Sequence, residues 1–289
     1  MKLRSRALVF LLSFLASFAA WGVPAASVDA VQLPAWRVRG EVSEPLAPGM
    51  ELQNGDQVRT GSGARVYLKL AEGSTVKLGE SARMSFYSRS LKPASFFRGA
   101  IDVAVGAFRY TTAQAAKLRQ RDVAIRVGTT TIGIRRTDVW GKSDDGQDLV
   151  MLIEGRIEVK LAGGEPVEIS DPLSVFVAPK GAAPLPLSTA TEAELKSRSR
   201  ETDLESSNGA LHLSGRYALR LGDALDEASA LGLYDQARIA GYPARIRPRR
   251  SESGWQYEVL VKGYASESEA RRAAGPVGTA LKVTATAVR

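Results

Sequence analysis

The side chains that usually carry enzyme chemistry are sparse in this sequence. There is no cysteine, so a thiolate nucleophile, a thiolate metal site and a disulfide framework are all excluded. His212 is the single histidine, and it lies in a linker-like segment where no catalytic triad can be assembled around it. Asp144 and Asp145 occupy the polar stretch SDDGQD, which lacks the full ligand pattern of a calcium loop. The sequence therefore predicts no catalytic residue, no metal site and no cofactor.

Positive charge is in excess along the chain. The 289 residues include 39 Lys or Arg against 31 Asp or Glu, which gives a formal net charge of +8. Such a balance favours anionic partners, namely nucleic acid, a membrane surface or an acidic polysaccharide. The basic run ARIRPRR, residues 244–250, has two interpretations: a strand leading into a solvated hairpin loop, or an edge that faces an anion.

The N-terminus has the layout of a secretory signal peptide. Three basic residues among the first six precede an apolar stretch, residues 7–20, and small residues suited to cleavage follow in VPAASVDA. We expect residues 1–27 to be the signal peptide and the mature chain to begin between residues 26 and 31. A retained signal anchor is the alternative, but a spanning helix needs about 20 apolar residues. The mature protein is therefore expected in the periplasm, without a stable membrane anchor and without nucleic acid as a partner.

Residues 33–179 consist of short alternating runs separated by glycine. Val66, Leu68 and Leu70 alternate with polar residues, as in a strand with one buried face. The stretch VMLIEGRIEVKL, residues 150–161, is interpreted as a strand, a Glu-Gly turn and a second strand. Many short strands joined by glycine turns predict an all-β domain, built as a short-strand, solenoid-like roll.

Residues 180–212 have a different character. The stretch APKGAAPLPLS is rich in Pro and Ala, which is typical of an extended linker. The stretch TATEAELKSRSRETDL predicts one short exposed helix capped by Thr191 or Thr189. Because linkers join independent units, we expect few contacts between the domains on either side.

Residues 213–289 predict an α+β domain with the element order β-α-β-β-α-β. One helix is expected from Asp226 to Ala240, ending at a glycine. A second follows Ser266, with Glu269 placed as in a capping box. This order is that of a split βαβ sandwich, whose antiparallel sheet has helices on one face and an open face on the other.

The first region resembles the FecR domain of bacterial envelope proteins. The resemblance is carried by PAWRVRGEVSEPLAPGMELQNGDQVRTGSGARVYLKLAEGSTVKLGE, GAFRYTT, TIGIRRTDVWGKS and LIEGRIEV, in this order within residues 33–179. The family pattern Gly-Ile-Arg-Gly-Thr is changed here, because Arg136 occupies the second glycine position. If that position has a positive φ, the arginine costs about 1 kcal/mol or more. The resemblance implies an all-β extracytoplasmic module, and we expect neither the cytoplasmic anti-sigma segment nor the spanning helix of the membrane-spanning regulator.

The C-terminal region looks like a SPOR domain. YALRLGDALDEASALGLYDQARIAGYPARI and WQYEVLVKGYASESEARRAA carry the resemblance. It implies binding, through the open sheet face, of peptidoglycan glycan strands that lack stem peptides. Two positions depart from the family pattern: Arg220 replaces a frequent glutamine, and Lys262-Gly263-Tyr264 replaces Gly-Pro-Phe.

Four residues are candidates for contact with the glycan. Alternation along the first strand places Arg220 outward, where it can pair with a lactyl carboxylate or lie solvated beside Asp223. On the third strand, Trp255 and Tyr257 share one face and Gln256 lies on the other. The sequence does not decide which of these two faces meets the core and which meets the sugar. Aromatic rings stack on sugars, and amide or charged groups fix orientation. We therefore nominate Arg220, Trp255, Gln256 and Tyr257.

These observations favour an exported, non-enzymatic envelope protein with two domains. The SPOR-like domain would bind the cell wall, and the FecR-like domain would contact another envelope protein or a polysaccharide. A periplasmic signalling protein, which senses a receptor through the FecR-like domain, is the alternative. A wall hydrolase is disfavoured because no acid/base pair is recognisable. Enrichment at the division site is left open.

Overall fold

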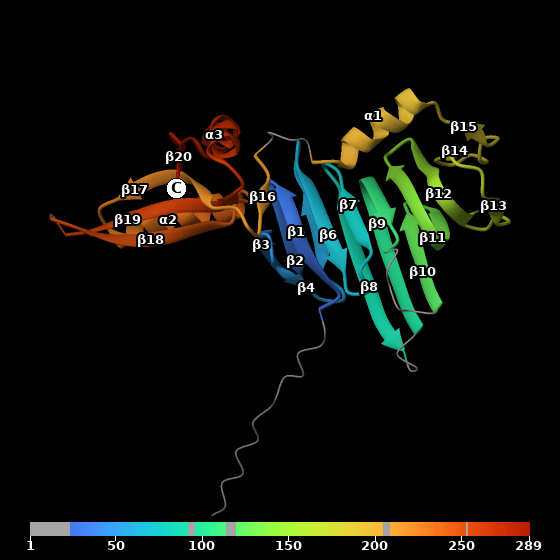
Figure 1. Cartoon of the computed structure of the whole chain (residues 1–289), viewed down its shortest axis with the longest axis horizontal. Helices are drawn as coiled ribbons and strands as arrows, with labels where there is room; N and C mark the ends of the chain where they lie inside the picture. The colour runs from blue at the N-terminus through green and yellow to red at the C-terminus, as the bar shows by residue number, and fades with distance from the viewer. Residues whose placement is uncertain (1–23, 92–95, 114–119, 205–208, 253) are drawn as a thin grey trace, which may run out of the picture.

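The computed structural model describes residues 24–91, 96–113, 120–204, 209–252 and 254–289 (Figure 1). Most of the predicted signal peptide, residues 1–23, lies outside the described residues. No described helix has the length and apolar character needed to cross a membrane. The N-terminal β domain lies at the right of Figure 1 with helix α1 above it, and the C-terminal domain lies at the left.

The N-terminal domain is all-β, as predicted, and its strands form two hydrogen-bonded layers that share three long strands. The first layer contains β1 (Ala26–Gln32), β4 (Glu51–Leu52), β6 (Arg65–Leu70), β7 (Thr75–Leu78), β14 (Ser174–Pro179), β15 (Ser188–Thr189) and β16 (Leu211–His212). The second layer contains β2 (Ala35–Arg39), β3 (Val42–Pro45), β5 (Gln57–Thr60), β8 (Arg83–Leu91), β10 (Gln120–Val127) and β13 (Val167–Ile169). The strands that belong to both layers are β9 (Phe96–Thr111), β11 (Thr130–Ser143) and β12 (Gln147–Leu161).

The three long strands pass from one layer to the other at residues with a positive φ. These residues are Gly106 (φ 94°) in β9, Arg136 (φ 51°) in β11 and Gly155 (φ 96°) in β12. The interpretation of residues 150–161 as two strands joined by a turn is therefore wrong, because β12 runs through Gly155 as one bent strand. A local pattern cannot distinguish a turn from a bend, since both need a left-handed residue.

The hydrophobic core lies between the two layers. Alternate residues of the first layer, such as Val66, Leu68 and Phe108, are in one buried cluster with alternate residues of the second layer, such as Met84 and Ile125. The sequence alternation that predicted a strand at residues 66–70 therefore matches the alternation of buried and solvent-facing side chains in β6.

The predicted helix in the linker is present as α1 (Glu192–Thr202), and Thr191 caps it. The helix lies on the outer side of the first layer. The guanidinium of Arg198 lies 5.6 Å from the ring centroid of Trp140, and Lys142 pairs with Glu201 at 2.7 Å. Beneath it, Trp140 and Met151 are buried in a second apolar cluster. This segment is therefore packed against the N-terminal domain along its length rather than free of it.

The C-terminal domain has the predicted α+β order. Its elements are β17 (Tyr217–Ala224), α2 (Glu227–Ile239), β18 (Ala244–Ser251), β19 (Gly254–Tyr264), α3 (Glu267–Leu281) and β20 (Thr286–Val288). They form an antiparallel sheet in the order β20–β17–β19–β18. Ser266 caps α3, but the carboxylate of Glu269 accepts a hydrogen bond from the Gly209 backbone at 2.6 Å, so no closed capping box forms.

The two domains touch at a small number of places, and the segment between them is paired rather than loose. β16 pairs with β1 of the N-terminal domain and also with the end of β19. The Trp36 indole donates a hydrogen bond to the Ile239 carbonyl at 3.2 Å, and the Ala35 backbone donates to the Gly241 carbonyl at 3.4 Å. Composition alone suggested a loose linker because it does not report what the linker pairs with.

The first strand begins earlier than the predicted domain start at residue 33. β1 pairs with β6 from Ala26 onward, and Ala25, Ala26 and Val28 are each 2% exposed. The N-terminal domain therefore includes residues just after the apolar stretch.

Candidate functional site

One face of the C-terminal sheet carries no helix. Leu219 and Leu221 of β17 and Val259 and Val261 of β19 point into the core together with residues of α2 and α3 such as Ala230. The alternate residues must point to the other side of the sheet. We call this side the basic face; it contains Ala218, Arg220, Asp223, Arg245, Arg247, Arg249, Gln256, Glu258, Leu260 and Lys262.

The structure separates the four nominated residues. Arg220 and Gln256 lie on the basic face, whereas Trp255 and Tyr257 alternate with Gln256 and have the parity of the core. Tyr257 is partly buried against the core, and Trp255, next to the β18–β19 turn, is 56% exposed. Four residues of strand separate Gln256 from Leu260, the neighbour of Arg220, which corresponds to about 13 Å. The ambiguity of β19 is thus resolved, and Gln256 is the β19 candidate that shares a face with Arg220.

Arg220 already has polar neighbours within the protein. Its Nη1 lies 3.3 Å from a carboxylate oxygen of Asp223, and its Nε lies 3.4 Å from Oγ1 of Thr286. The arginine side chain is 36% exposed. Both contacts are long, so a better-placed carboxylate can compete for the guanidinium.

A buried carboxylate organises the neighbouring part of the basic face. Glu258 is 5% exposed and accepts hydrogen bonds from Arg247 at 2.6 Å and Arg249 at 2.9 Å. Burial would raise the pKa of Glu258, but the hydrogen bonds and charges of the two arginines outweigh it and hold the pKa below its ordinary value. Glu258 is therefore ionised at neutral pH and fixes two arginines side by side.

Leu260 forms the centre of the basic face. It is fully buried, yet it lies outside the hydrophobic core clusters. Its cross-strand neighbours are Arg220 on β17 and Arg245 on β18. Because Leu260 has no exposed surface, this row offers a ligand two cations, one on each side of the buried leucine.

The four candidate residues chosen from the sequence do not include three arginines of β18 that lie on the basic face. Arg245, Arg247 and Arg249 are alternate residues of the run ARIRPRR, and the whole run is a strand that leads into the β18–β19 hairpin, as one of the two interpretations had it. Pro248 is compatible with that strand because β18 pairs only with β19 among the described residues, so it is an edge strand. Applying the period of two to this run would have found them.

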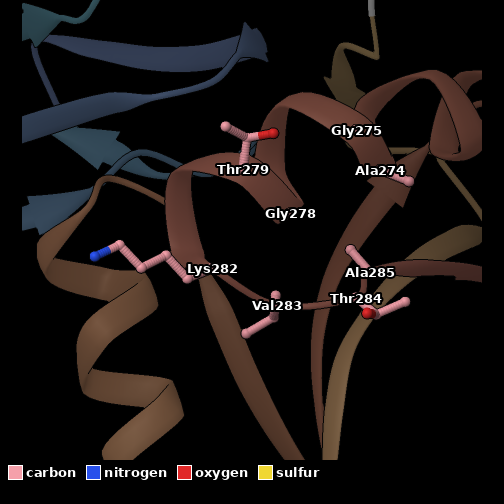
Figure 2. Close-up of a pocket in the computed structure, with 8 residues that line it drawn as sticks. All are labelled: Ala274, Gly275, Gly278, Thr279, Lys282, Val283, Thr284 and Ala285. Carbon is pink, nitrogen blue, oxygen red and sulfur yellow. The ribbon is translucent and has the colours of Figure 1, made fainter.

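A shallow depression near the C-terminus is a weaker candidate. It has a volume of about 560 Å³ and is lined by small residues of α3 and by residues 282–285. Figure 2 shows the Lys282 side chain extending away from it. No other charged side chain lines the depression, so it offers little to hold an anion.

Two buried carboxylates of the N-terminal domain, Asp148 and Glu72, are satisfied by neighbouring groups of the same domain. Asp148 accepts hydrogen bonds from Lys180, Ser143 and the backbone of Thr129. Glu72 accepts from the Tyr110 hydroxyl at 3.1 Å. In the part of the chain that the structure describes, no group of three or more His, Cys, Asp or Glu residues could hold a metal ion. These clusters therefore stabilise turns.

Comparison with known proteins assigns both regions. Residues 56–158 match the family model described as FecR protein, and residues 213–279 match the model described as SPOR domain. Two crystal structures, at 2.50 and 1.65 Å, of a protein proposed to be an anti-sigma factor from Parabacteroides distasonis ATCC 8503 share 11% sequence identity with this chain. Their TM-scores are 0.41 and 0.39, and the matches cover 73% and 69% of this chain and 99% and 96% of theirs. No curated protein matches the sequence.

Proposed function

We propose that this chain, which carries a FecR domain followed by a SPOR domain, is a periplasmic protein that binds bare peptidoglycan glycan strands. Both domains are associated with the bacterial envelope and serve regulation and binding rather than catalysis. The SPOR domain indicates binding to peptidoglycan. The finer proposal is that the ligand is the glycan strand without stem peptides, and that the basic face is where it binds.

The single observation that carries this proposal is the chemistry of the basic face. Removal of a stem peptide frees the lactyl carboxylate of each muramic acid, so a bare strand is a polyanion. Residues 211–289 contain twelve Lys or Arg against eight Asp or Glu. Arg220 and Gln256 lie on the side of the sheet that α2 and α3 leave open. Trp255, which is exposed at the margin of the sheet, could stack on a sugar ring, whereas Tyr257 has less surface to offer.

Replacing Arg220 tests the proposed binding face. The change Arg220→Gln should weaken binding to amidase-treated sacculi on the order of tenfold and flatten its salt dependence, because a charge-assisted contact is worth roughly 1.5–3 kcal/mol. Co-sedimentation of the full chain is the measurement. The control is Arg238→Gln, which makes the same charge change on α2, where the arginine stacks on Tyr234. An unchanged affinity and salt slope would remove Arg220 from the site, because the arginine would then be solvated beside Asp223.

The FecR domain is proposed to contact a second partner, an envelope protein or a polysaccharide. The alternative is signalling, in which this domain senses a receptor. Affinity purification from periplasmic extract separates the two, since one stoichiometric receptor favours signalling. Imaging a fluorescent fusion with and without residues 213–289 tests whether the SPOR domain determines location, including any enrichment at the division site.

A further inference from the structure

The edge strand of the basic face carries a row of arginines that the nominated glycan contacts do not include. Arg245, Arg247 and Arg249 occupy alternate positions of β18, so their Cα atoms lie about 6.7 Å apart along one line. Their side chains start from the same face as Arg220 and Gln256. The row extends that face to the outer edge of the sheet.

The internal ion pairs do not use up this charge. Glu258 is the carboxylate opposite the row, and it contacts Arg247 through Nε and Arg249 through Nη1. A guanidinium has five N–H donors, so most donors of both arginines remain for a ligand. Arg245 has no carboxylate partner among the described residues, and neither does Lys262. One buried carboxylate therefore faces three arginines and leaves a net positive row.

The geometry suits carboxylates that repeat along a chain. The planar guanidinium fork matches a carboxylate better than the point charge of a lysine does. Arg220 and Arg245 flank Leu260 across two strand spacings, about 9.5 Å. Two carboxylates of one extended polymer can thus meet the face at once, one at each arginine.

We propose that Arg245, Arg247 and Arg249 form a carboxylate-reading row on β18, which makes binding depend on the free carboxylates of the glycan. The inference rests on the proposed binding of bare glycan strands. It adds the chemical group that is recognised and a second line of contact beside Arg220. Glu258 serves as a positioning residue that holds Arg247 and Arg249 next to each other.

The test compares bare sacculi with bare sacculi whose carboxylates have been amidated chemically. The full chain should bind the amidated sacculi about tenfold more weakly in co-sedimentation, since the row would lose its charged partners. The double variant Arg245→Gln and Arg249→Gln should bind bare sacculi about tenfold more weakly and should discriminate less between the two preparations. It keeps Arg247 and therefore leaves Glu258 paired.

The matched control is the double variant Arg238→Gln and Arg271→Gln, which removes the same charge from α2 and α3. If it loses as much affinity as the β18 variant, net charge alone explains binding and the carboxylate-reading row is refuted. Equal binding of the wild type to bare and amidated sacculi also refutes the row but leaves glycan binding intact. Failure of the wild type to bind either preparation overturns the proposed function and the inference with it. If the double variant does not fold, Arg245→Gln alone carries the comparison, because Arg245 has no ion-pair partner among the described residues.

Discussion

Replacing Arg136 with glycine should stabilise the protein. Arg136 has a φ of 51° at the bend where β11 passes between the layers, and its side chain is exposed. The bend is held from both sides: Thr137 donates a hydrogen bond to the Arg156 carbonyl at 2.9 Å, and its backbone donates to Thr112 Oγ1 at 2.9 Å. The chain therefore cannot relax the left-handed residue without breaking these contacts.

The magnitude follows from two opposing terms. A left-handed conformation costs an L-residue about 1–2 kcal/mol. Glycine avoids this cost, but its greater freedom in the unfolded chain costs about 0.5–1 kcal/mol. We therefore expect Arg136→Gly to raise the free energy of unfolding by about 0.5–1 kcal/mol, which corresponds to a rise in Tm of about 1–4 °C for a domain of this size.

The matched control is Arg135→Gly, one residue earlier. Arg135 is also exposed but has no positive φ, so the same change should lower the free energy of unfolding by about 0.5–1 kcal/mol. Urea denaturation of both variants, followed by tryptophan fluorescence, measures the difference. If the Arg136→Gly and Arg135→Gly variants have equal free energies of unfolding, the reasoning is refuted, because the bend would then impose no left-handed strain on residue 136.

Three further predictions concern the domain contact, acid stability and processing. Gly241→Ala should separate the domains, because Gly241 has a φ of 88° and an added Cβ would lie 2.6 Å from the Trp36 ring. Small-angle scattering should then show a larger maximum dimension. The control Gly181→Ala should leave that dimension unchanged, because Gly181 also has a positive φ (74°) but has open space around it. Burial would raise the pKa of Asp148, but hydrogen bonds from Lys180 and its neighbours hold the pKa below its ordinary value. Its stabilising effect is therefore complete above the unfolded pKa of about 3.9 and is lost as pH falls through the lower folded pKa, so urea titrations of Asp148→Asn should show a flatter acid dependence than wild type. N-terminal sequencing of the exported protein should find a first residue in the early part of the predicted range 26–31, since cleavage after Ala30 would remove most of a paired strand. Val31 at the N-terminus would contradict this.

Much of the fold was predictable because its signals are local. Alternation marked Val66, Leu68 and Leu70 as one face of a strand, and Thr191, Asp226 and Ser266 marked the starts of the three helices. These features depend on the geometry of a single strand or a single helical turn, so neighbouring residues are enough to specify them. The order β-α-β-β-α-β follows from such signals taken in sequence.

The candidate site was only partly predictable. Alternation placed Arg220 on the outer face, but it could not decide which side of β19 meets the core, and only packing against α2 and α3 assigns Gln256 to the basic face. The arginines of β18 became a row only through their register with Glu258 and Leu260. Register joins residues from different strands, and no local period encodes it.

Long-range contacts decided the rest. Nothing near Gly155 in the chain distinguishes a turn from a bend, since the difference lies in whether β12 continues to pair with β11 on both sides of it. The segment around α1 has a linker's composition, yet it packs over Trp140 and Met151, which are far away in sequence. Composition and periodicity therefore determined which elements form and which faces they can bury, whereas the tertiary structure decided which surfaces meet, because burial of an apolar face depends on partners that the local sequence does not contain.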